Sequence, residues 1–226
     1  MKKLIAVAVL AAFSSLPYAA EKDITTDVVV VGQGAAGTAA AFAAAEQGAK
    51  VIGLEKKGMV GGTGNFSEGI FAVGSKMQRD YYIPLTKDEA FKKIMNYGHW
   101  RSNARLVRAF VDKSADTVEW MQKHGVKFEK LTTNYLYTWH IYQGRGAGWI
   151  NALQKKGKDK YGMQVLLNTP AEKLIFGKDG KVAGVVAKDK DGNTLNIHAK
   201  AVIIATGGFA DNPEMMKKYT RYCSDR

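Results

Sequence analysis

The sequence predicts an α/β fold with a parallel sheet, and three observations predict it. Val28 to Val31 is an unbroken run of β-branched residues, which is typical of a strand buried on both faces. The alanine-rich segment from Thr38 to Gln47 follows, and alanine has the highest helix propensity. Val51 to Leu54 is a second apolar run of strand length, so the chain opens with a strand–helix–strand unit.

The turn between this first strand and its helix has the sequence Gly32-Gln33-Gly34-Ala35-Ala36-Gly37. Gly32 permits a tight turn, Gly34 lets a pyrophosphate approach the backbone, and Gly37 permits close helix–strand packing. The free N–H groups and the dipole of a helix N-terminus both favour an anion at this point.

Glu55 ends the second strand, close to the spacing of about 20 residues expected for an acid that binds ribose hydroxyls. An acid here disfavours a 2′-phosphate. Together these features predict a Rossmann-like dinucleotide-binding core. The alternative is a glycine turn in an ordinary α/β protein.

Lys56 to Ser75 is a second glycine-rich stretch. A flexible linker is one interpretation of this composition. Thr63, Asn65, Phe66 and Ile70 favour an ordered loop instead, because side chains of these kinds can pack or form hydrogen bonds.

An inserted helical region is predicted at about residues 76–125. Thr86 to Trp100 has Thr86 as a helix N-cap and Glu89 three residues later, which is a capping box. Asn103 or Ser102 is predicted to cap a second helix that runs to about Lys123.

The aromatic residues that follow alternate as on one face of a strand: Tyr135, Tyr137, Trp139 and Tyr142. Packing of a half-buried strand is the favoured interpretation, and base stacking is the alternative.

The remaining segments predict a helix, a β-meander and a final core strand. Gly144 to Gly148 opens the helix, which runs to about Lys158, and Asp179-Gly180 and Asp191-Gly192 are typical hairpin turns. The predicted strands are Gln164 to Leu167, Glu172 to Phe176, Val182 to Ala187, Asn196 to His198 and a buried strand from Ala201 to Ala205. Asn212 and Pro213 then start a last helix.

Composition excludes some kinds of site and leaves others open. The formal charge of +12 suits an anionic substrate, an acidic partner or nucleic acid, but the lysines are scattered, which favours a basic solvated surface. Cys223 is the only cysteine, so no internal disulfide and no CxxC or CxxCH site is possible. The four histidines lack metal-ligand spacing, so no metal site is predicted.

Met1 to Ala20 has the features of a secretory signal: Lys2-Lys3, an apolar core and small residues at its end. The apolar run is too short for an ordinary membrane span, although a retained N-terminal anchor is an alternative. We expect export to a periplasm, a domain over residues 21–226, and no stable membrane span.

Three blocks in this order resemble a known family: Gly32 to Gly37 with Glu55-Lys56, then Gly61 to Gly69, then Ala205 to Phe209. The chain resembles the N-terminal flavin-binding half of the fumarate reductase/succinate dehydrogenase flavoproteins. It is most similar to their soluble, exported branch of flavocytochrome c fumarate reductases and urocanate reductases. The resemblance covers about residues 24–222.

The resemblance implies FAD as the cofactor. It is expected to be non-covalent, because no histidine that could carry the flavin precedes His99. The residues implied to bind FAD are Gly32, Gly34, Ala35, Ala36, Gly37, Glu55, Lys56, Gly61, Gly62, Thr63, Gly64, Asn65, Ser67, Gly69, Ala171, Thr206, Gly207 and Gly208.

The chemistry that the resemblance implies is hydride transfer between flavin and an α,β-unsaturated carboxylate such as fumarate, with electrons from a separate carrier such as a c-type cytochrome. In the family the substrate-binding residues lie in a cap and a C-terminal segment beyond the Thr206–Gly208 strand end, so no catalytic residue is assigned. Arg145 and His140 are weighed as catalytic groups, and structural roles are favoured for both.

Three alternatives remain open. The first is another flavin dehydrogenase on the same scaffold, such as a 3-ketosteroid dehydrogenase-like enzyme. The second is a non-catalytic dinucleotide-binding module that completes a partner chain. The third is an NAD-dependent dehydrogenase, because the same fold serves both cofactors.

Overall fold

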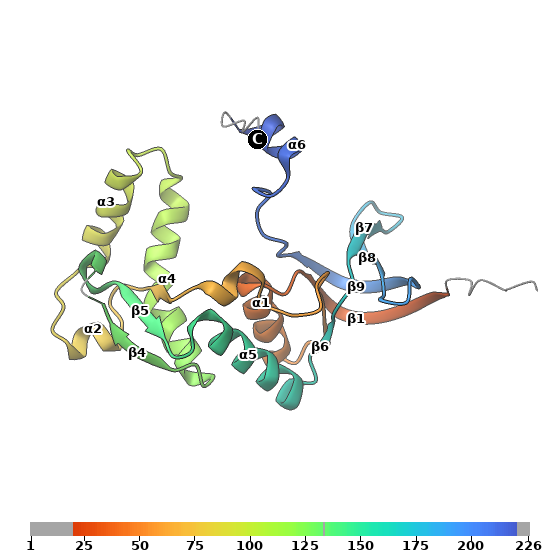
Figure 1. Cartoon of the computed structure of the whole chain (residues 1–226), viewed down its shortest axis with the longest axis horizontal. Coiled ribbons are helices and arrows are strands. Elements are labelled where there is room, and N and C mark those ends of the chain that lie inside the picture. Colours follow the sequence, from red (N-terminus) through yellow and green to blue (C-terminus); the bar gives the residue numbers. More distant parts are fainter. Residues whose placement is uncertain (1–19, 133, 221–226) are drawn as a thin grey trace, which may run out of the picture.

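The computed structural model describes residues 20–132 and 134–220 (Figure 1). Its main sheet has six strands in the order β6-β2-β1-β9-β8-β7. Their bounds are Glu21–Val31 (β1), Val51–Leu54 (β2), Gln164–Leu166 (β6), Ala171–Phe176 (β7), Val182–Lys188 (β8) and Thr194–Ile204 (β9). The first four in spatial order are parallel, and β9, β8 and β7 form an antiparallel meander. The predicted α/β class is confirmed.

Strand β1 is longer than its sequence indicates. The polar segment Glu21 to Thr26 precedes the run Val28 to Val31 that predicts the strand, yet it is part of the strand, because it pairs in parallel register with β9 from Glu21↔Thr194 onward. The two strands predicted at Asn196 and Ala201 are likewise one strand, β9, which pairs with β1 along its length and with β8 over its first half.

Two helices, α1 (Ala35–Glu46) and α5 (Arg145–Tyr161), pack together beside the parallel strands (Figure 1). Ala41 and Ala45 of α1 are buried against Val30 and Val51. The small alanine side chains let the helix approach the sheet closely, and the alanine-rich segment forms a helix as predicted.

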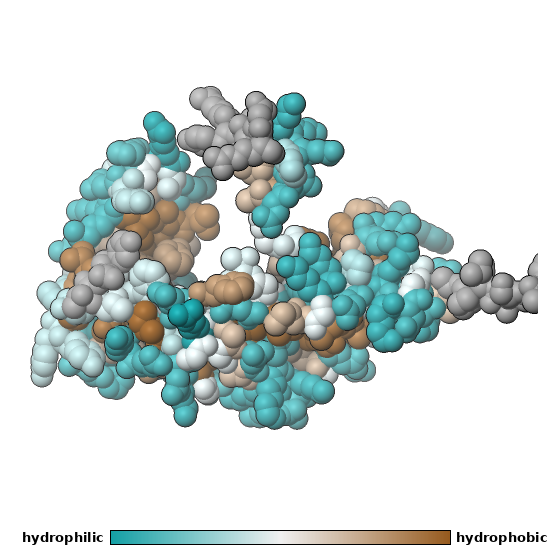
Figure 2. Space-filling model, viewed as in Figure 1, coloured by the Kyte–Doolittle hydropathy of each residue, from teal (hydrophilic) through white to brown (hydrophobic). Residues whose placement is uncertain are grey.

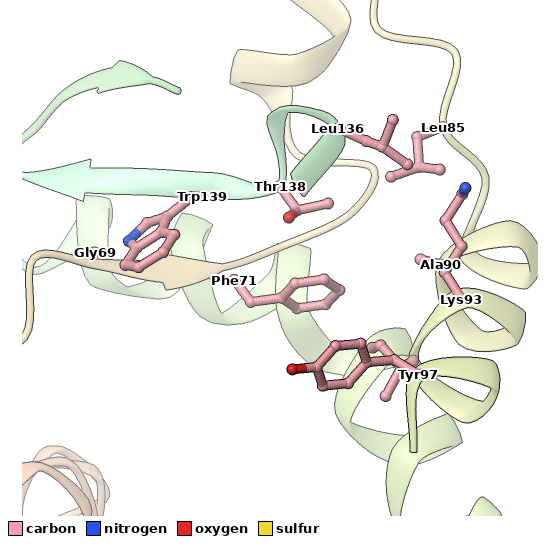
Figure 3. A pocket seen from close by; sticks show the side chains of 10 residues that line it. Gly69, Phe71, Leu85, Ala90, Lys93, Tyr97, Leu136, Thr138 and Trp139 are labelled. Carbon is pink, nitrogen blue, oxygen red and sulfur yellow. The ribbon is translucent and has the colours of Figure 1, made fainter. Parts of the chain in front are cut away.

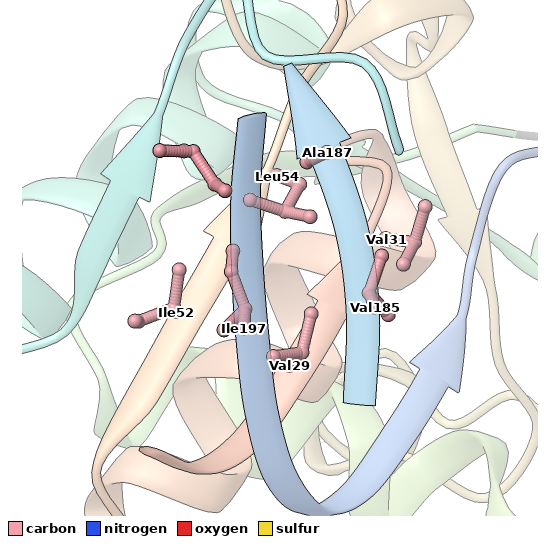
Figure 4. Packing of buried hydrophobic residues seen from close by; sticks show 8 residues of the cluster. Val29, Val31, Ile52, Leu54, Val185, Ala187 and Ile197 are labelled. Carbon is pink, nitrogen blue, oxygen red and sulfur yellow. The ribbon is translucent and has the colours of Figure 1, made fainter. Parts of the chain in front are cut away.

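A separate apolar cluster forms on the side chains that point away from α1. There Val29 and Leu54 of the parallel strands pack with Val185 of β8 and Ile197 of β9 (Figure 4). The meander therefore covers part of the sheet with its own buried valines and isoleucine. This packing gives the edge of the dinucleotide-binding core a second apolar layer.

A helical region and a small sheet lie at the far end of the molecule (Figure 1). The helices are α2 (Lys76–Asp80), α3 (Lys87–Tyr97) and α4 (Ala104–Lys123), and the sheet has the order β3-β5-β4 (Gly69–Phe71, Trp139–Tyr142 and Phe128–Leu131). Thr86 caps α3 with the predicted capping box to Glu89, and Asn103 caps α4.

Helix α2 lies within the predicted helical region but was not predicted as a separate helix, although Ser75 and Gln78 form a second capping box at its start. The single aromatic strand predicted from Tyr135 to Tyr142 is wrong. Asn134–Tyr137 is a 3-10 helix, and only Trp139–Tyr142 is a strand. The chain turns because Leu136 and Tyr137 have positive φ angles of 60° and 58°.

After β9 the chain leaves the sheet and forms α6 (Pro213–Tyr219), capped by Asn212 as predicted. The expectation that the strand from Ala201 to Ala205 is buried is wrong, because Ala201 is exposed, Ile204 is 60% exposed and the other three residues are only half-buried. No described helix is both long and apolar enough to cross a bilayer. Apart from Ala20, the predicted signal segment lies outside the described residues, as does Cys223.

Candidate functional site

The N-terminus of α1 has the features of an anion site. Its N-cap, Gly34, supplies no side-chain cap, and the first turn carries no acidic residue. Thr38 is the first residue whose N–H bonds back, to Gly34 O at 2.9 Å. Within the described chain, the N–H groups of Ala36 and Gly37 therefore have no hydrogen-bond acceptor, as a bound pyrophosphate requires.

The first glycine turn lies directly against the end of β9. Ala205 N–H donates to Val31 O at 2.8 Å. A Cβ on Gly32 would lie 2.6 Å from Ala205 O, and one on Gly37 would lie 1.8 Å from Gly32 O. Gly32 also has a φ of +89°, which favours glycine. The two ends of the predicted cofactor site are therefore neighbours.

The second glycine-rich stretch crosses the start of α1. Gly61 N–H donates to Gln33 O at 2.7 Å, and Gly34 and Gly61 form an isolated parallel bridge. A Cβ on Gly64 would lie 3.0 Å from Ala35 Cβ. The first and second predicted blocks thus share one surface.

This second stretch is an ordered loop, as predicted, and contains a short 3-10 helix, Gly62–Phe66. Asn65 Nδ2 donates to Val60 O at 2.9 Å, and Ser67 Oγ donates to Gly64 O at 2.8 Å. Both side chains therefore stabilise the conformation of the loop by bonding to its own backbone. Thr63 and Gly62 are exposed on its surface.

Glu55 is buried at the end of β2, and backbone groups fix its carboxylate. Oε2 accepts from Gln33 N–H at 3.0 Å, and Oε1 accepts from Lys57 N–H at 2.9 Å. The carboxylate therefore stands beside the glycine turn. Each oxygen still has acceptor capacity for a ribose hydroxyl. Lys56, the next residue, is exposed.

Ala171 lies near this end of the site. Two residues earlier, Thr169 N–H donates to Glu55 O at 2.9 Å, and Ala171 then begins β7. At the other end, Thr206, Gly207 and Gly208 are exposed, and Cβ atoms built on the two glycines would meet no atom within 4 Å. These glycines border open space, which a large cofactor can fill.

Sequence reasoning missed a buried amide network beneath the first turn. Gln33 is fully buried, and its Oε1 accepts from Gln154 Nε2 at 3.0 Å. Gln154 Nε2 also donates to Thr38 Oγ1 at 2.9 Å, so α5 is tied to α1 and to the turn. A Cβ on Gly53 would lie 2.5 Å from Gln33 Cδ, which explains the glycine in the middle of β2. A glycine in the middle of an apolar strand was the one sequence feature that could have indicated this close contact.

His140 and Arg145, the two residues considered above as catalytic groups, lie in different environments. His140 is fully buried; its Nε2 lies 2.7 Å from Ser75 Oγ, and its Nδ1 lies 3.0 Å from Thr138 O. Burial lowers the pKa of His140, against the effect of its hydrogen bonds to backbone. Arg145 is exposed at the start of α5. No cluster of three potential metal ligands occurs among the described residues.

Comparison with sequence families gives a match to the family described as "FAD binding domain" over residues 27–224. A vinyl phenol reductase of Lactiplantibacillus plantarum is 40% identical over 203 residues, which cover 88% of this chain and 41% of the relative. An NADH:fumarate oxidoreductase of Klebsiella pneumoniae is 32% identical and is matched over 85% of this chain and 21% of its own length. The chain thus spans less than half the length of each of these relatives.

Solved structures give the same result for the fold. The open conformation of a flavocytochrome c3 fumarate reductase superposes with a TM-score of 0.79 at 31% identity, covering 87% of this chain and 36% of that one. A 3-ketosteroid dehydrogenase from Rhodococcus jostii has a TM-score of 0.77 at 23% identity, covering 87% of this chain and 49% of that one. At that lower identity the likeness concerns the fold alone.

Proposed function

The chain belongs to the FAD binding domain family, among the fumarate reductase flavoproteins, and we propose that it is the flavin-binding part of a reductase of activated alkenes. The observation that carries the proposal is the convergence of three glycine segments. The turn that begins at Gly32 contacts both of the other segments, the strand end at Ala205 and the loop at Gly61, beside the uncapped start of α1.

FAD, the cofactor of this family, would be held without a covalent bond along this surface. The N–H groups of Ala36 and Gly37 would bind its pyrophosphate, and Glu55 would accept from the adenosine ribose. Gly62 to Gly69 would border the flavin, with Asn65 and Ser67 acting through the shape of the loop. The edges of this FAD-binding surface would be formed by Lys56, Ala171 and Thr206 to Gly208.

When bound, FAD would supply hydride transfer to an alkene that a carboxylate or a conjugated ring activates. The chain's own part is to bind, orient and shield the cofactor. The fixed N–H groups of α1 would stabilise the negative charge of its phosphates without reorganisation of the protein. The buried Glu55 carboxylate is already oriented by two backbone donors.

The substrate and partners are part of the proposal. Relatives named for vinyl phenol, fumarate and urocanate favour an unsaturated, anionic or phenolic small molecule. A relative named fumarate reductase (cytochrome), from Shewanella frigidimarina, is 31% identical and favours a separate cytochrome as electron donor. The signal-like N-terminal sequence favours a periplasmic location.

Titration of the purified chain with FAD and with NAD tests the proposal. We expect saturable, one-to-one quenching of flavin fluorescence by the protein, and no saturable binding of NAD. Tight NAD binding with no response to FAD would favour the dehydrogenase alternative and contradict the proposal.

A further inference from the structure

A hollow of about 680 Å³ lies between α3 and the small sheet (Figure 3). Its walls are apolar and include Phe71, Trp139, Leu85, Ile94 and Leu136. Apolar surface also gathers over α3 and α4 in the space-filling view (Figure 2). A volume of this size with few polar groups is typical of a small-molecule site.

Two polar side chains reach the hollow from consecutive turns of α3. They are Lys93 and Tyr97, and both are exposed to solvent at its mouth. Lys93 forms no ion pair within the described part of the chain. The carboxylate one turn earlier, Glu89, accepts from the N–H and the hydroxyl of Thr86, each at 2.8 Å. Glu89 is therefore engaged in the helix cap, and Lys93 can pair with a ligand.

The hollow adjoins the loop assigned above to the flavin. Gly69 ends that loop, begins β3 and lines the hollow. A Cβ on Gly69 would lie 2.3 Å from Trp139 Cδ1, so the indole packs directly over the glycine. A molecule in the hollow would consequently lie beside the flavin side of the cofactor surface.

We propose that this hollow binds the aromatic ring of an aryl-conjugated alkene and that Lys93 pairs with its single carboxylate or phenolate. The inference rests on the proposed function and names the substrate class of that site. A planar ring would cover the surfaces of Phe71 and Trp139 and remove them from water. A small dicarboxylate has little apolar surface to offer these walls. It also has two charges, whereas Lys93 is the single cation among the described residues that line the hollow.

Ligand-observed NMR and tryptophan fluorescence on the 226-residue chain test this proposal, with 4-hydroxycinnamate as probe and fumarate as comparison. We expect 4-hydroxycinnamate to bind at least about tenfold more tightly than fumarate. Lys93→Gln should weaken that binding by about three- to fivefold, as loss of one exposed ion pair does. Lys92→Gln is the matched control, because Lys92 is its exposed neighbour on α3 outside the hollow, and it should change nothing.

The same titrations are repeated with FAD present. Retained 4-hydroxycinnamate binding supports the proposal, whereas displacement by FAD would assign the hollow to the flavin ring and overturn it. Equal binding of fumarate, or equal effects of the two lysine variants, would also overturn it. Failure of FAD to bind while the Lys93-dependent binding persists would instead count against the proposed function alone.

Discussion

The backbone of Gly32 approaches that of Ala205 so closely that a Cβ on the glycine would lie 2.6 Å from the Ala205 carbonyl oxygen. Residues far apart in the chain are thus brought into direct contact. The contact exists because β1 and β9 are parallel neighbours whose carboxyl ends meet at one edge of the sheet. Ligands of open α/β sheets bind at this edge, which agrees with the placement of FAD proposed above.

Substitution of Gly32 by alanine should therefore impair both folding and cofactor binding. The new Cβ would clash with backbone, and the residue would also keep a φ of +89°. We expect FAD affinity to fall at least about tenfold. Gly180→Ala is the matched control: Gly180 has a φ of +75° in a remote hairpin, and its Cβ would meet no atom within 4 Å.

The Gly180→Ala control should lower the free energy of unfolding by about 1 kcal/mol, because alanine is disfavoured at a positive φ, and it should leave the FAD affinity unchanged. Urea unfolding and FAD titration of the two variants make the comparison. Equal FAD affinity in G32A and wild type would show that the Gly32 corner is not part of the site.

The substitution Glu55→Gln should weaken the binding of FAD more than it weakens the binding of FMN. FMN lacks the adenosine ribose that Glu55 is proposed to bind, so only FAD loses that contact. Glu172→Gln, which removes an exposed carboxylate paired with Lys188 at 3.2 Å, is the control and should affect neither ligand. Parallel titrations with both flavins measure the ratio, and an unchanged ratio in E55Q would remove Glu55 from the ribose site.

The substitution Gln154→Ala should destabilise the glycine turn, because it removes the buried side chain that binds Gln33 and Thr38. The variant leaves Gln33 Oε1 buried without its donor and deprives Thr38 Oγ1 of another. An unsatisfied buried polar group costs about 1–3 kcal/mol, so urea unfolding should show a loss in that range. A loss well below 1 kcal/mol would mean that the network contributes little to the turn.

Stability should decrease as the pH falls below neutrality. Burial lowers the pKa of His140 and of His124 in the folded protein, in the latter against the attraction of Glu46. Below the unfolded value of 6.5 the unfolded chain takes up protons that the folded chain resists, so unfolding becomes more favourable. Each histidine contributes a slope of at most about 1.4 kcal/mol per pH unit.

Urea unfolding at a series of pH values from about 5 to about 8, a range that brackets the ordinary pKa of histidine, measures this slope. His140→Gln should be less stable at pH 8 and should have a shallower slope below pH 6.5. His99→Gln, at an exposed position, serves as control and should keep the wild-type slope. A stability that rises as the pH falls would have the wrong sign for this explanation.

The parts of the site that depend on backbone geometry could be predicted from the sequence. Gly32 and Gly37 occupy positions where a side chain cannot fit, and such a requirement is visible in the residue type itself. The position of Glu55 beside the turn could be predicted for a similar reason, because it directly follows a short apolar strand that pairs with β1.

The parts that depend on long-range contacts could not be predicted in this way. The polar first half of β1 is a strand only because β9 pairs with it. The bond between Gln33 and Gln154 joins residues on separate elements, and neither residue forms a local pattern. The turn at Leu136 and Tyr137 has positive φ angles that their residue types do not indicate.

Amide hydrogen exchange with and without FAD tests most directly whether one cofactor spans the glycine turn and the end of β9. The account predicts that FAD slows exchange in both segments, Gly32 to Gly37 and Ala205 to Phe209, at the same FAD concentration. Protection of only one segment, or of neither under conditions that saturate binding, would contradict it.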